Sequence, residues 1–479
     1  MTEPTSYQSP LGSRYASPAM QRLWSPEHRA HVWRSLWLAL AQHEKRLGIE
    51  IPEPAIAEMQ AHLDDVNLEA VQQYEHRFRH DVMAHIHAFA DQAPSARPFL
   101  HLGATSAFVT DNADLLIMRD ALRLLLGRLV AVLRALSAFA VEMQSMPTVA
   151  YTHFQPAQLT TVGKRATLWL QDFFLDTRAV SETADSLPFR GCKGTTGTQA
   201  SYLDLFHGDH EKVRELDAAV AASMGFHQSI PVSGQTYTRK IDSRVLDVLS
   251  GIGQSASKFA NDLRLLQHEG ELLEPAEREQ VGSSAMPYKR NPMRAERISA
   301  LSRHVMTLTT NTAVTAATQW LERTLDDSAN RRLTLPEAFL ATDAVLVLCT
   351  NVAAGLEVNQ AVIARNVSRV MPFMASERWL MRGVEAGGDR QTLHEVVRKH
   401  SRAVADAIAT GADNDLIDRL AAEPAFAAVD IESLRSDLDP VHYVGRAAEQ
   451  VIEFVNGPLS ELLDSMASYE APDESVVTL

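Results

Sequence analysis

The segment "LLIMRDALRLLLGRLVAVLRALSAFAVEM", residues 115–143, decides the fold. Leu115 opens a series of apolar residues at every seventh position, and Met118 opens a second series with the same spacing. Two such series form a heptad pattern, which is typical of a long helix that packs along its whole length. Further leucines at 116, 124 and 126 widen the apolar face. The segment therefore predicts a helix buried in a multi-helix bundle.

Helical periodicity continues on both sides of this segment. It runs through 159–184 and 241–266, and further helices are expected at about 293–323 and, after Pro336, to about 356. No run of residues has the alternation typical of a strand. The fold is therefore expected to be all-α.

The N-terminal part also reads as helical. Ser25, Pro26 and Glu27 form an N-cap, a first-turn proline and a favourably placed acid, and the helix they begin should stop at Gly48. After two prolines, residues 67–92 read as one further helix that ends before Pro94.

The last 120 or so residues differ from the rest, with shorter segments, the loop "EAGGDRQ" and an acidic tail. We therefore expect three helical domains: an N-terminal domain over 1–105, a central long-helix bundle over 106–357 and a smaller C-terminal domain over 358–479. Bundles with such long helices commonly associate as symmetric oligomers.

Composition restricts the class of protein. With 479 residues, of which 46% are hydrophobic and 22% charged, the chain can bury a large core. Its formal net charge of -15 argues against nucleic acid or anionic lipid as the main partner. Cys192 and Cys349 are too few for a disulfide framework or a thiolate metal site, which fits a reducing cytoplasm.

No membrane segment or signal peptide is expected. The N-terminus has no basic start followed by an apolar core. The most apolar long stretch contains Arg119, Arg123, Arg128 and Arg134, which a span of about 20 residues would not tolerate.

Several kinds of chemistry can be excluded. The sequence has no phosphate-binding GxxxxGK[ST], no strand-linked GxGxxG and no GxSxG. "HEVVR" at 394–398 lacks the second histidine of a zinc protease motif. His76, His80 and His87 fall on one side of an expected helix and leave three interpretations open: a metal site, a solvated polar face, or histidines that line a cleft.

The loop "VGSSAMPYKRNP", residues 281–292, interrupts the helices with small residues. Such a loop can close over a ligand and carry a reactive hydroxyl with it. Lys289 and Asn291 supply a cation and an amide suited to a carboxylate or an oxyanion. The alternative is an ordinary solvated loop.

Two further segments carry candidate groups. "YTHFQPAQLTTVGKR", 151–165, places His153 before Pro156 at the start of a long helix, although an isolated histidine is usually structural. "ERTLDDSANRR", 322–332, gathers arginines around Ser328, which alone would indicate a solvated salt-bridge face.

These segments together carry a resemblance. "GSSAMPYKRNP" resembles the signature loop of the fumarase/aspartase superfamily, GSSxMPxKxNP. A larger set of motifs is similar to the adenylosuccinate lyase family of the eukaryotic type, and it spans nearly the whole chain. The set comprises "SRYAS" at 13–17, "RHDVMAH" at 79–85, "LGATSAFVTDN" at 102–112, "THFQPAQLTTVGKR" at 152–165, "GTTGTQAS" at 194–201, "GQTYTRK" at 234–240 and "LDDSANRR" at 325–332.

The resemblance implies an enzyme of purine biosynthesis. It would eliminate fumarate from adenylosuccinate to give AMP, and from the succinyl-carboxamide ribotide (SAICAR) to give AICAR, without a cofactor or metal. It also implies a homotetramer whose long helices form a twenty-helix core, with each active site assembled from three subunits.

The resemblance also implies residue roles. Ser283 would be the general base and His153 the general acid, with Lys289 assisting Ser283, Glu296 orienting His153 and His80 supporting catalysis. The substrate carries a phosphate and two carboxylates, so an acidic protein must gather cations locally. The cations that match by position are Arg14, Arg79, Lys289, Arg297, Arg323 and Arg332. The remaining expected binding residues are Tyr15, His80, Asp81, Thr105, Ser106, Gln235, Asn291 and Ser328.

Two alternatives stay open from the sequence. A sister lyase that acts on argininosuccinate or aspartate would share the loop but not the motifs at 152–165 and 325–332 in this form. A helical scaffold that has kept the fold and lost catalysis would lack the expected catalytic residues, both of which are present here.

Overall fold

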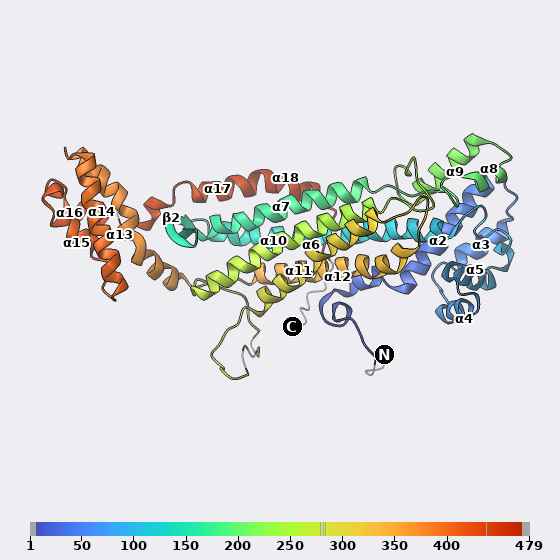
Figure 1. The fold of residues 1–479 in the computed structure, drawn as a ribbon, viewed down its shortest axis with the longest axis horizontal. Coiled ribbons are helices and arrows are strands. Elements are labelled where there is room, and N and C mark those ends of the chain that lie inside the picture. Colours follow the sequence, from blue (N-terminus) through green and yellow to red (C-terminus); the bar gives the residue numbers. More distant parts are fainter. Residues whose placement is uncertain (1–5, 278, 281, 283, 437, 472–479) are drawn as a thin grey trace.

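The computed structural model describes residues 6–471 except 278, 281, 283 and 437. The molecule is elongated, with a bundle of long helices in the middle (Figure 1). Helices α13 to α16 lie at one end of the bundle, and helices α2 to α5, α8 and α9 lie at the other. The expected mostly helical fold is confirmed.

The first hundred residues form short and medium helices. They are η1 (Leu11–Tyr15), α1 (Pro18–Leu23), α2 (Pro26–Arg46), α3 (Glu53–Ala61), α4 (Leu68–Phe78), α5 (Asp81–Gln92) and η2 (Pro94–Ala96). The expected start of α2 is confirmed, because the Ser25 side chain accepts a hydrogen bond from the His28 N–H and Pro26 occupies the first turn.

The central part holds the longest helices. Its elements are α6 (Ser106–Glu142), β1 (Pro147–Thr152), β2 (Gln155–Thr161), α7 (Val162–Ser186), α8 (Ala200–Leu205), α9 (His210–Ser223), α10 (Lys240–His268), β3 (Leu272–Leu273), α11 (Met293–Ala317), α12 (Asp326–Ala354) and β4 (Glu357–Val358).

The remaining elements are short apart from two helices. They are α13 (Gln360–Glu385), α14 (Arg390–Ala409), α15 (Leu416–Ala421), η3 (Pro424–Phe426), α16 (Ile431–Ser436), η4 (Pro440–Tyr443), α17 (Ala447–Phe454), η5 (Val455–Leu459) and α18 (Ser460–Ser465). The division into three domains stays a prediction.

Helix α6 is the buried centre of the bundle, as its heptads predict. Leu115, Leu122, Leu129 and Leu136 are all fully buried, and α6 packs against α7 and α12. A buried ion pair between Arg128 of α6 and Asp343 of α12, at 3.1 Å, joins two of these helices inside the core.

Two helices, Ser106–Glu142 and Asp326–Ala354, are long and apolar enough to cross a membrane by length and composition alone. However, 61% and 67% of their most apolar windows are buried inside the protein. Their apolar surface is thus explained by packing in the bundle, as in the core helices of soluble proteins.

The expectation that the chain contains no strands was wrong. β1 and β2 form an antiparallel hairpin in which Thr152 pairs with Gln155, and β3 pairs with β4 in a second small sheet. The helix expected from residue 159 therefore begins only at Val162.

Two helix boundaries also differ from the expectation. The helix expected over 67–92 is broken at Arg79, which has φ of 54° and ends α4 in the left-handed conformation. Helix α11 ends at Ala317, and α12 begins at Asp326 and continues through Pro336. The segment 318–325 is therefore a connection that faces the site described below.

Glu44 of α2 is fully buried, and neither of its carboxyl oxygens has a hydrogen-bond partner among the described residues. Burial raises its pKa from 4.5 to about 9, so the folded protein keeps this carboxyl protonated. In the unfolded chain the same group ionises near its ordinary pKa. Between these two values unfolding releases a proton, and rising pH therefore lowers stability through this group.

We expect Glu44→Gln to become progressively more stable than the wild type as pH rises from about 5 to about 9. The limiting slope is roughly 1.4 kcal/mol per pH unit, since each pKa unit corresponds to that free energy. Melting temperatures at pH 5, 7 and 9 measure this difference, and Glu27→Gln in the first turn of the same helix is the control. A pH-independent difference between Glu44→Gln and the wild type would contradict the prediction.

Candidate active site

A polar cavity of about 440 Å³ lies between the N-terminal helices and the central bundle. Its walls come from α2, α4, α5, α6, α12 and the connections before α10 and α12. Eight of the expected site residues line it: Arg79, His80, Asp81, Ser106, Gln235, Arg323, Ser328 and Arg332. Residues from several separate sequence motifs thus converge on one cavity.

His80 and Ser106 face each other across the mouth of the cavity. The Nδ1 atom of His80 accepts a hydrogen bond from the Met83 N–H at 3.3 Å and caps helix α5. A neutral imidazole that accepts at Nδ1 carries its proton on Nε2. That N–H can donate to Ser106 Oγ, which lies 3.4 Å away at the start of α6. Thr105 is the N-cap of the same helix.

Asp81 and Arg332 form an ion pair that links α5 to α12 across the cavity. Burial would raise the pKa of Asp81, but the hydrogen bond from the Val82 N–H and the Arg332 guanidinium outweigh burial and lower it. The Arg332 side chain is 53% exposed and lines the cavity, so it stays accessible to solvent beside Asp81. It is therefore available to an incoming anion.

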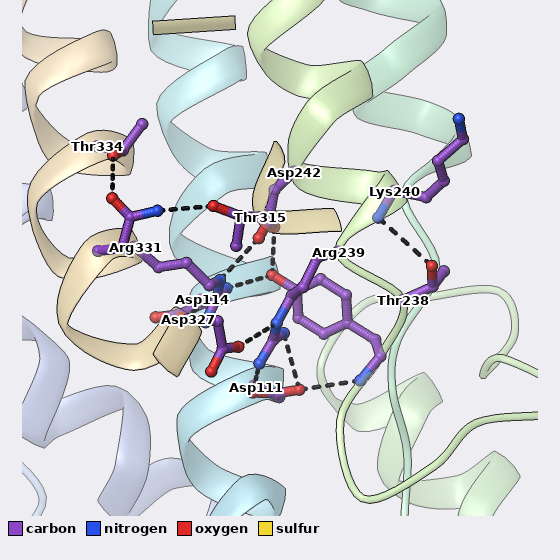
Figure 2. A network of polar contacts seen from close by, with 12 residues as sticks. Asp111, Asp114, Thr238, Arg239, Lys240, Asp242, Thr315, Asp327, Arg331 and Thr334 are labelled. Carbon is purple, nitrogen blue, oxygen red and sulfur yellow. Dashed lines mark hydrogen bonds and ion pairs between the residues drawn. The ribbon is translucent and has the colours of Figure 1, made fainter. Parts of the chain in front are cut away.

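A network of charged side chains, drawn in Figure 2, contributes five residues to the lining of the cavity. Arg239 donates to both oxygens of Asp111 at 3.1 and 3.2 Å and to Asp327 at 2.6 Å. Arg331 pairs with Asp242 at 2.7 Å and with Asp114 at 2.9 Å. The buried ion network is defined as Asp111, Asp114, Tyr237, Arg239, Asp242, Asp327 and Arg331.

The network joins three segments that are far apart in the sequence: 111–114, 237–242 and 327–331. It ties α6 to α12, to α10 and to the connection that carries Tyr237. Burial would raise the pKa of Asp111, but Arg239, Arg331 and Arg190 outweigh it and lower the pKa. Asp111 therefore stays ionised between its arginine partners at the cavity.

Gln235 reaches the cavity through a close approach of two backbone segments. The Gln235 N–H donates to Glu322 O at 3.0 Å. A Cβ at the preceding Gly234 would lie 2.6 Å from the same oxygen. Only glycine allows this approach, which holds Gln235 beside the segment that carries Arg323.

The other expected binding residues form a second group. Arg297, in the first turns of α11, stacks over the Tyr15 ring at 5.3 Å, and Arg14 lies 5.9 Å from the same ring. None of these three residues lines the polar cavity.

The loop at 281–292 is anchored at its C-terminal end. Arg290 forms two hydrogen bonds of 2.9 Å with Glu357, and the Asn291 amide donates to Gly282 O at 2.7 Å. Lys289 and Glu296 are exposed, and Ser283 lies outside the described residues. The role of Asn291 in binding stays a prediction. In the structure its side-chain amide joins the two ends of the loop through Gly282.

His153 occupies the tip of the β1–β2 hairpin and is exposed. Both residues of the two-residue turn have positive φ, 52° for His153 and 56° for Phe154. For residues other than glycine this conformation costs roughly 1–2 kcal/mol each. Such strain persists only where the surrounding structure enforces it, and it is common at functional sites.

In one chain these groups do not all meet. The hairpin lies at the end of the bundle near α13, whereas α5 and its cavity residues lie at the opposite end (Figure 1). The expected histidine triplet is also separated: His76 lies on α4, His80 caps α5, and His87 packs on the Phe78 ring at 4.7 Å. Among the described residues no cluster of three or more His, Cys, Asp or Glu could hold a metal ion.

Sequence reasoning missed several residues of the cavity. Its lining also includes the aromatic residues Trp24 and Trp33 and the charged residues Asp111, Asp114, Arg239 and Asp327. The charged residues stand inside or beside quoted motifs, but nothing in the sequence shows that they pair with one another. The tryptophans gave no signal, because a tryptophan in or beside a helix usually belongs to the core.

Comparisons with known structures define the class of fold. A fumarate lyase from Mesorhizobium sp. BNC1 superposes with a TM-score of 0.80 over 94% of this chain and 100% of its own, at 23% identity. A 3-carboxy-cis,cis-muconate lactonizing enzyme from Pseudomonas putida gives 0.80 over 95% of this chain and 98% of its own, at 24% identity. The family model described as Lyase matches residues 17–307. The chain is therefore a lyase of the fumarase/aspartase superfamily.

Sequence comparisons specify the family. An adenylosuccinate lyase of Schizosaccharomyces pombe is 48% identical over 99% of this chain and 97% of its own length. An adenylosuccinate lyase of Saccharomyces cerevisiae is 46% identical over 98% of both. The family model for the adenylosuccinate lyase C-terminus matches residues 372–454. The chain belongs to the adenylosuccinate lyase family.

Proposed function

We propose that the chain catalyses β-elimination of fumarate from adenylosuccinate to give AMP, and from SAICAR to give AICAR, in purine biosynthesis. It is a carbon–nitrogen lyase. The observation that carries this proposal is the identity of 48% with an adenylosuccinate lyase along nearly the full length of both chains. The polar cavity supports it, since it gathers arginines from several elements of an acidic protein.

The direct test is incubation of the purified protein with adenylosuccinate. We expect fumarate and AMP to form in equal amounts, which absorbance and chromatography measure. Argininosuccinate and aspartate serve as control substrates. Fumarate release from either control, with none from adenylosuccinate, would place the chain with a sister lyase instead, and no release from any substrate would indicate a scaffold.

The cavity provides what a polyanionic substrate needs. Arg79, Arg323 and Arg332 come from three elements and line one cavity, so a phosphate or carboxylate there can receive several charge-assisted hydrogen bonds. Ser106, Gln235 and Ser328 add neutral polar groups around the same space. We assign the binding of substrate anions to these residues, together with Arg14, Tyr15 and Arg297 of the second group.

The chemistry requires a base and an acid on different sides of the substrate. A base removes the proton from the carbon next to a carboxylate, cations stabilise the resulting aci-carboxylate, and an acid protonates the departing nitrogen. We assign the base to Ser283, assisted by Lys289, and the acid to His153, oriented by Glu296. His80 supports the site from the cavity.

We further propose a homotetramer with active sites shared between subunits. Its support is that the β1–β2 hairpin, whose turn carries His153, and helix α5, whose first residue lines the polar cavity, lie at opposite ends of one chain (Figure 1). We infer that another copy supplies the missing group. Large apolar side chains of the bundle are also exposed in the single chain, which is typical of surfaces that contact another protein. They are Leu168 and Leu175 on α7, Leu265 on α10, Val314 on α11, and Trp320, Leu321 and Leu325 beyond it.

The remaining assignments follow from the same family. We propose a cytoplasmic location, which the two buried, free cysteines Cys192 and Cys349 support, and we expect no cofactor to be required. Domains at 1–105, 106–357 and 358–479 fit the described elements, since α6 begins at Ser106 and α13 begins at Gln360.

A further inference from the structure

Asp327 lies between two arginines, the buried Arg239 and the partly exposed Arg323. Its side chain is fully buried, and its Oδ2 atom accepts a hydrogen bond from Arg239 Nε at 2.6 Å. Its Oδ1 atom has no hydrogen-bond partner among the described residues, and Arg323 Nη1 lies 3.7 Å from it. Arg323 lines the polar cavity and is 26% exposed, so Asp327 connects a buried cation to a cavity cation.

Arg239 is fixed in place. Two of its nitrogens bind both oxygens of Asp111, and its guanidinium stacks over the Tyr237 ring at 4.5 Å. Figure 2 shows Arg239 between Asp111 and Asp327, and all three residues line the cavity. A bidentate, stacked guanidinium has little freedom left, so Asp327 is anchored to a rigid point.

The charges of the buried ion network do not balance internally. Within it, four carboxylates, Asp111, Asp114, Asp242 and Asp327, face the two guanidinium groups of Arg239 and Arg331. Buried carboxylates need compensating cations. Among the described residues, the Asp327 oxygen that accepts no hydrogen bond lies 3.7 Å from the cavity arginine Arg323, so an attraction acts between the two charges.

We propose that Asp327 is a positioning residue, which holds Arg323 ready to bind an anionic group of the substrate. This inference rests on the proposed lyase function. Arg323 forms no hydrogen bond to Asp327 at 3.7 Å, so its donors stay free for a ligand while its charge is balanced from behind. A cation that is already in place loses less conformational entropy when the anion arrives.

Asp327→Asn separates this role from a purely electrostatic one. The carbonyl of the introduced asparagine must accept from Arg239 Nε, so its NH₂ group faces Arg323 and no longer attracts it. If Asp327 acted only as a negative charge near the ligand, removing that charge would strengthen anion binding. If Asp327 positions Arg323, losing that position weakens anion binding instead. The two explanations therefore predict opposite changes in KM.

We expect Asp327→Asn to raise KM for adenylosuccinate by about tenfold to a hundredfold, the size of a lost charge-assisted hydrogen bond, and to change kcat much less. Inhibition constants of AMP and of fumarate, measured on the same variant, identify whether Arg323 binds the phosphate or a carboxylate. The control is Asp217→Asn, which removes a buried carboxylate paired with Lys193 at 2.6 Å outside the cavity. It should lower the melting temperature without raising KM.

A double-mutant cycle completes the test. In an Arg323→Met background, Asp327→Asn should cause no further loss of affinity, because the residue that it positions is gone. An unchanged or lower KM in Asp327→Asn, or the same fold loss in both backgrounds, would overturn the inference. These outcomes require an active wild type, so they differ from failure of the proposed function, in which the wild type itself releases no fumarate.

Discussion

Replacing Ser283 by alanine should leave substrate binding nearly unchanged and lower kcat for fumarate release by roughly 10³- to 10⁴-fold, the upper part of the range for a general base. The reason is chemical: the carbon next to a carboxylate holds its proton tightly, and Ser283 is the hydroxyl that the proposal places on the loop to remove it. In the proposed site the cavity arginines are unchanged by this substitution, so equilibrium binding of adenylosuccinate to the variant should persist. Single-turnover measurement of fumarate checks the rate, and calorimetry checks the binding.

The neighbouring serine provides a matched control for this experiment. Ser284 is exposed on the same loop and differs from Ser283 by one position. Ser284→Ala should keep kcat within about threefold of the wild type, since a substitution at an exposed surface position usually has little effect. If Ser284→Ala loses the activity and Ser283→Ala keeps it, the base has been assigned to the wrong serine.

The second large effect concerns His153. His153→Gln should lower kcat by about 10²- to 10⁴-fold, because the departing nitrogen then leaves without a positioned acid. The loss should be greatest where the pH-rate profile of the wild type shows its acid protonated. His227→Gln, at another exposed histidine, should behave like the wild type. Steady-state rates from pH 6 to 9 measure both variants.

Shared active sites add a second measurement on the same variants. If His153 of one copy serves a site that uses Ser283 of another, inactive His153→Gln and Ser283→Ala chains should regain activity when they are dissociated together and reassembled. Some hybrid sites then contain both native residues. Mixtures that stay inactive, although mass measurement shows hybrid oligomers, would mean that both residues belong to one chain's site.

The sequence predicted the bundle because its signal was local and repeated. Heptads over 115–143 determine which face of α6 is buried, and the cap at Ser25 determines where α2 begins. Both features depend on neighbours within a few turns of the chain. The hairpin escaped prediction because Pro156 and the polar residues around it break the alternation of a strand. The break at Arg79 has neither glycine nor proline to announce it.

The sequence predicted which residues belong to the candidate site, but not which of them lie together in the fold. Motif resemblance named His80, Ser106, Gln235 and Arg332, and the structure brings them to one cavity. It could not show that Arg239 and Asp327 line the same cavity, since the pairing of charges depends on how α6, α10 and α12 pack. Nor could it show that His153 lies at the far end of the same chain, because a sequence motif does not say how far apart two residues lie in the fold.

The two-residue turn at the hairpin tip restricts how this part of the protein can vary. Thr152 and Gln155 pair directly, so His153 follows a paired residue at once and only Phe154 separates it from the other strand. Inserting or deleting a single amino acid there would require another turn type or a bulge, or would shift the ladder by one position and send alternate side chains to the opposite face of the ribbon. Related chains should therefore tolerate changes of side chain around His153 while keeping the number of residues between the strands constant.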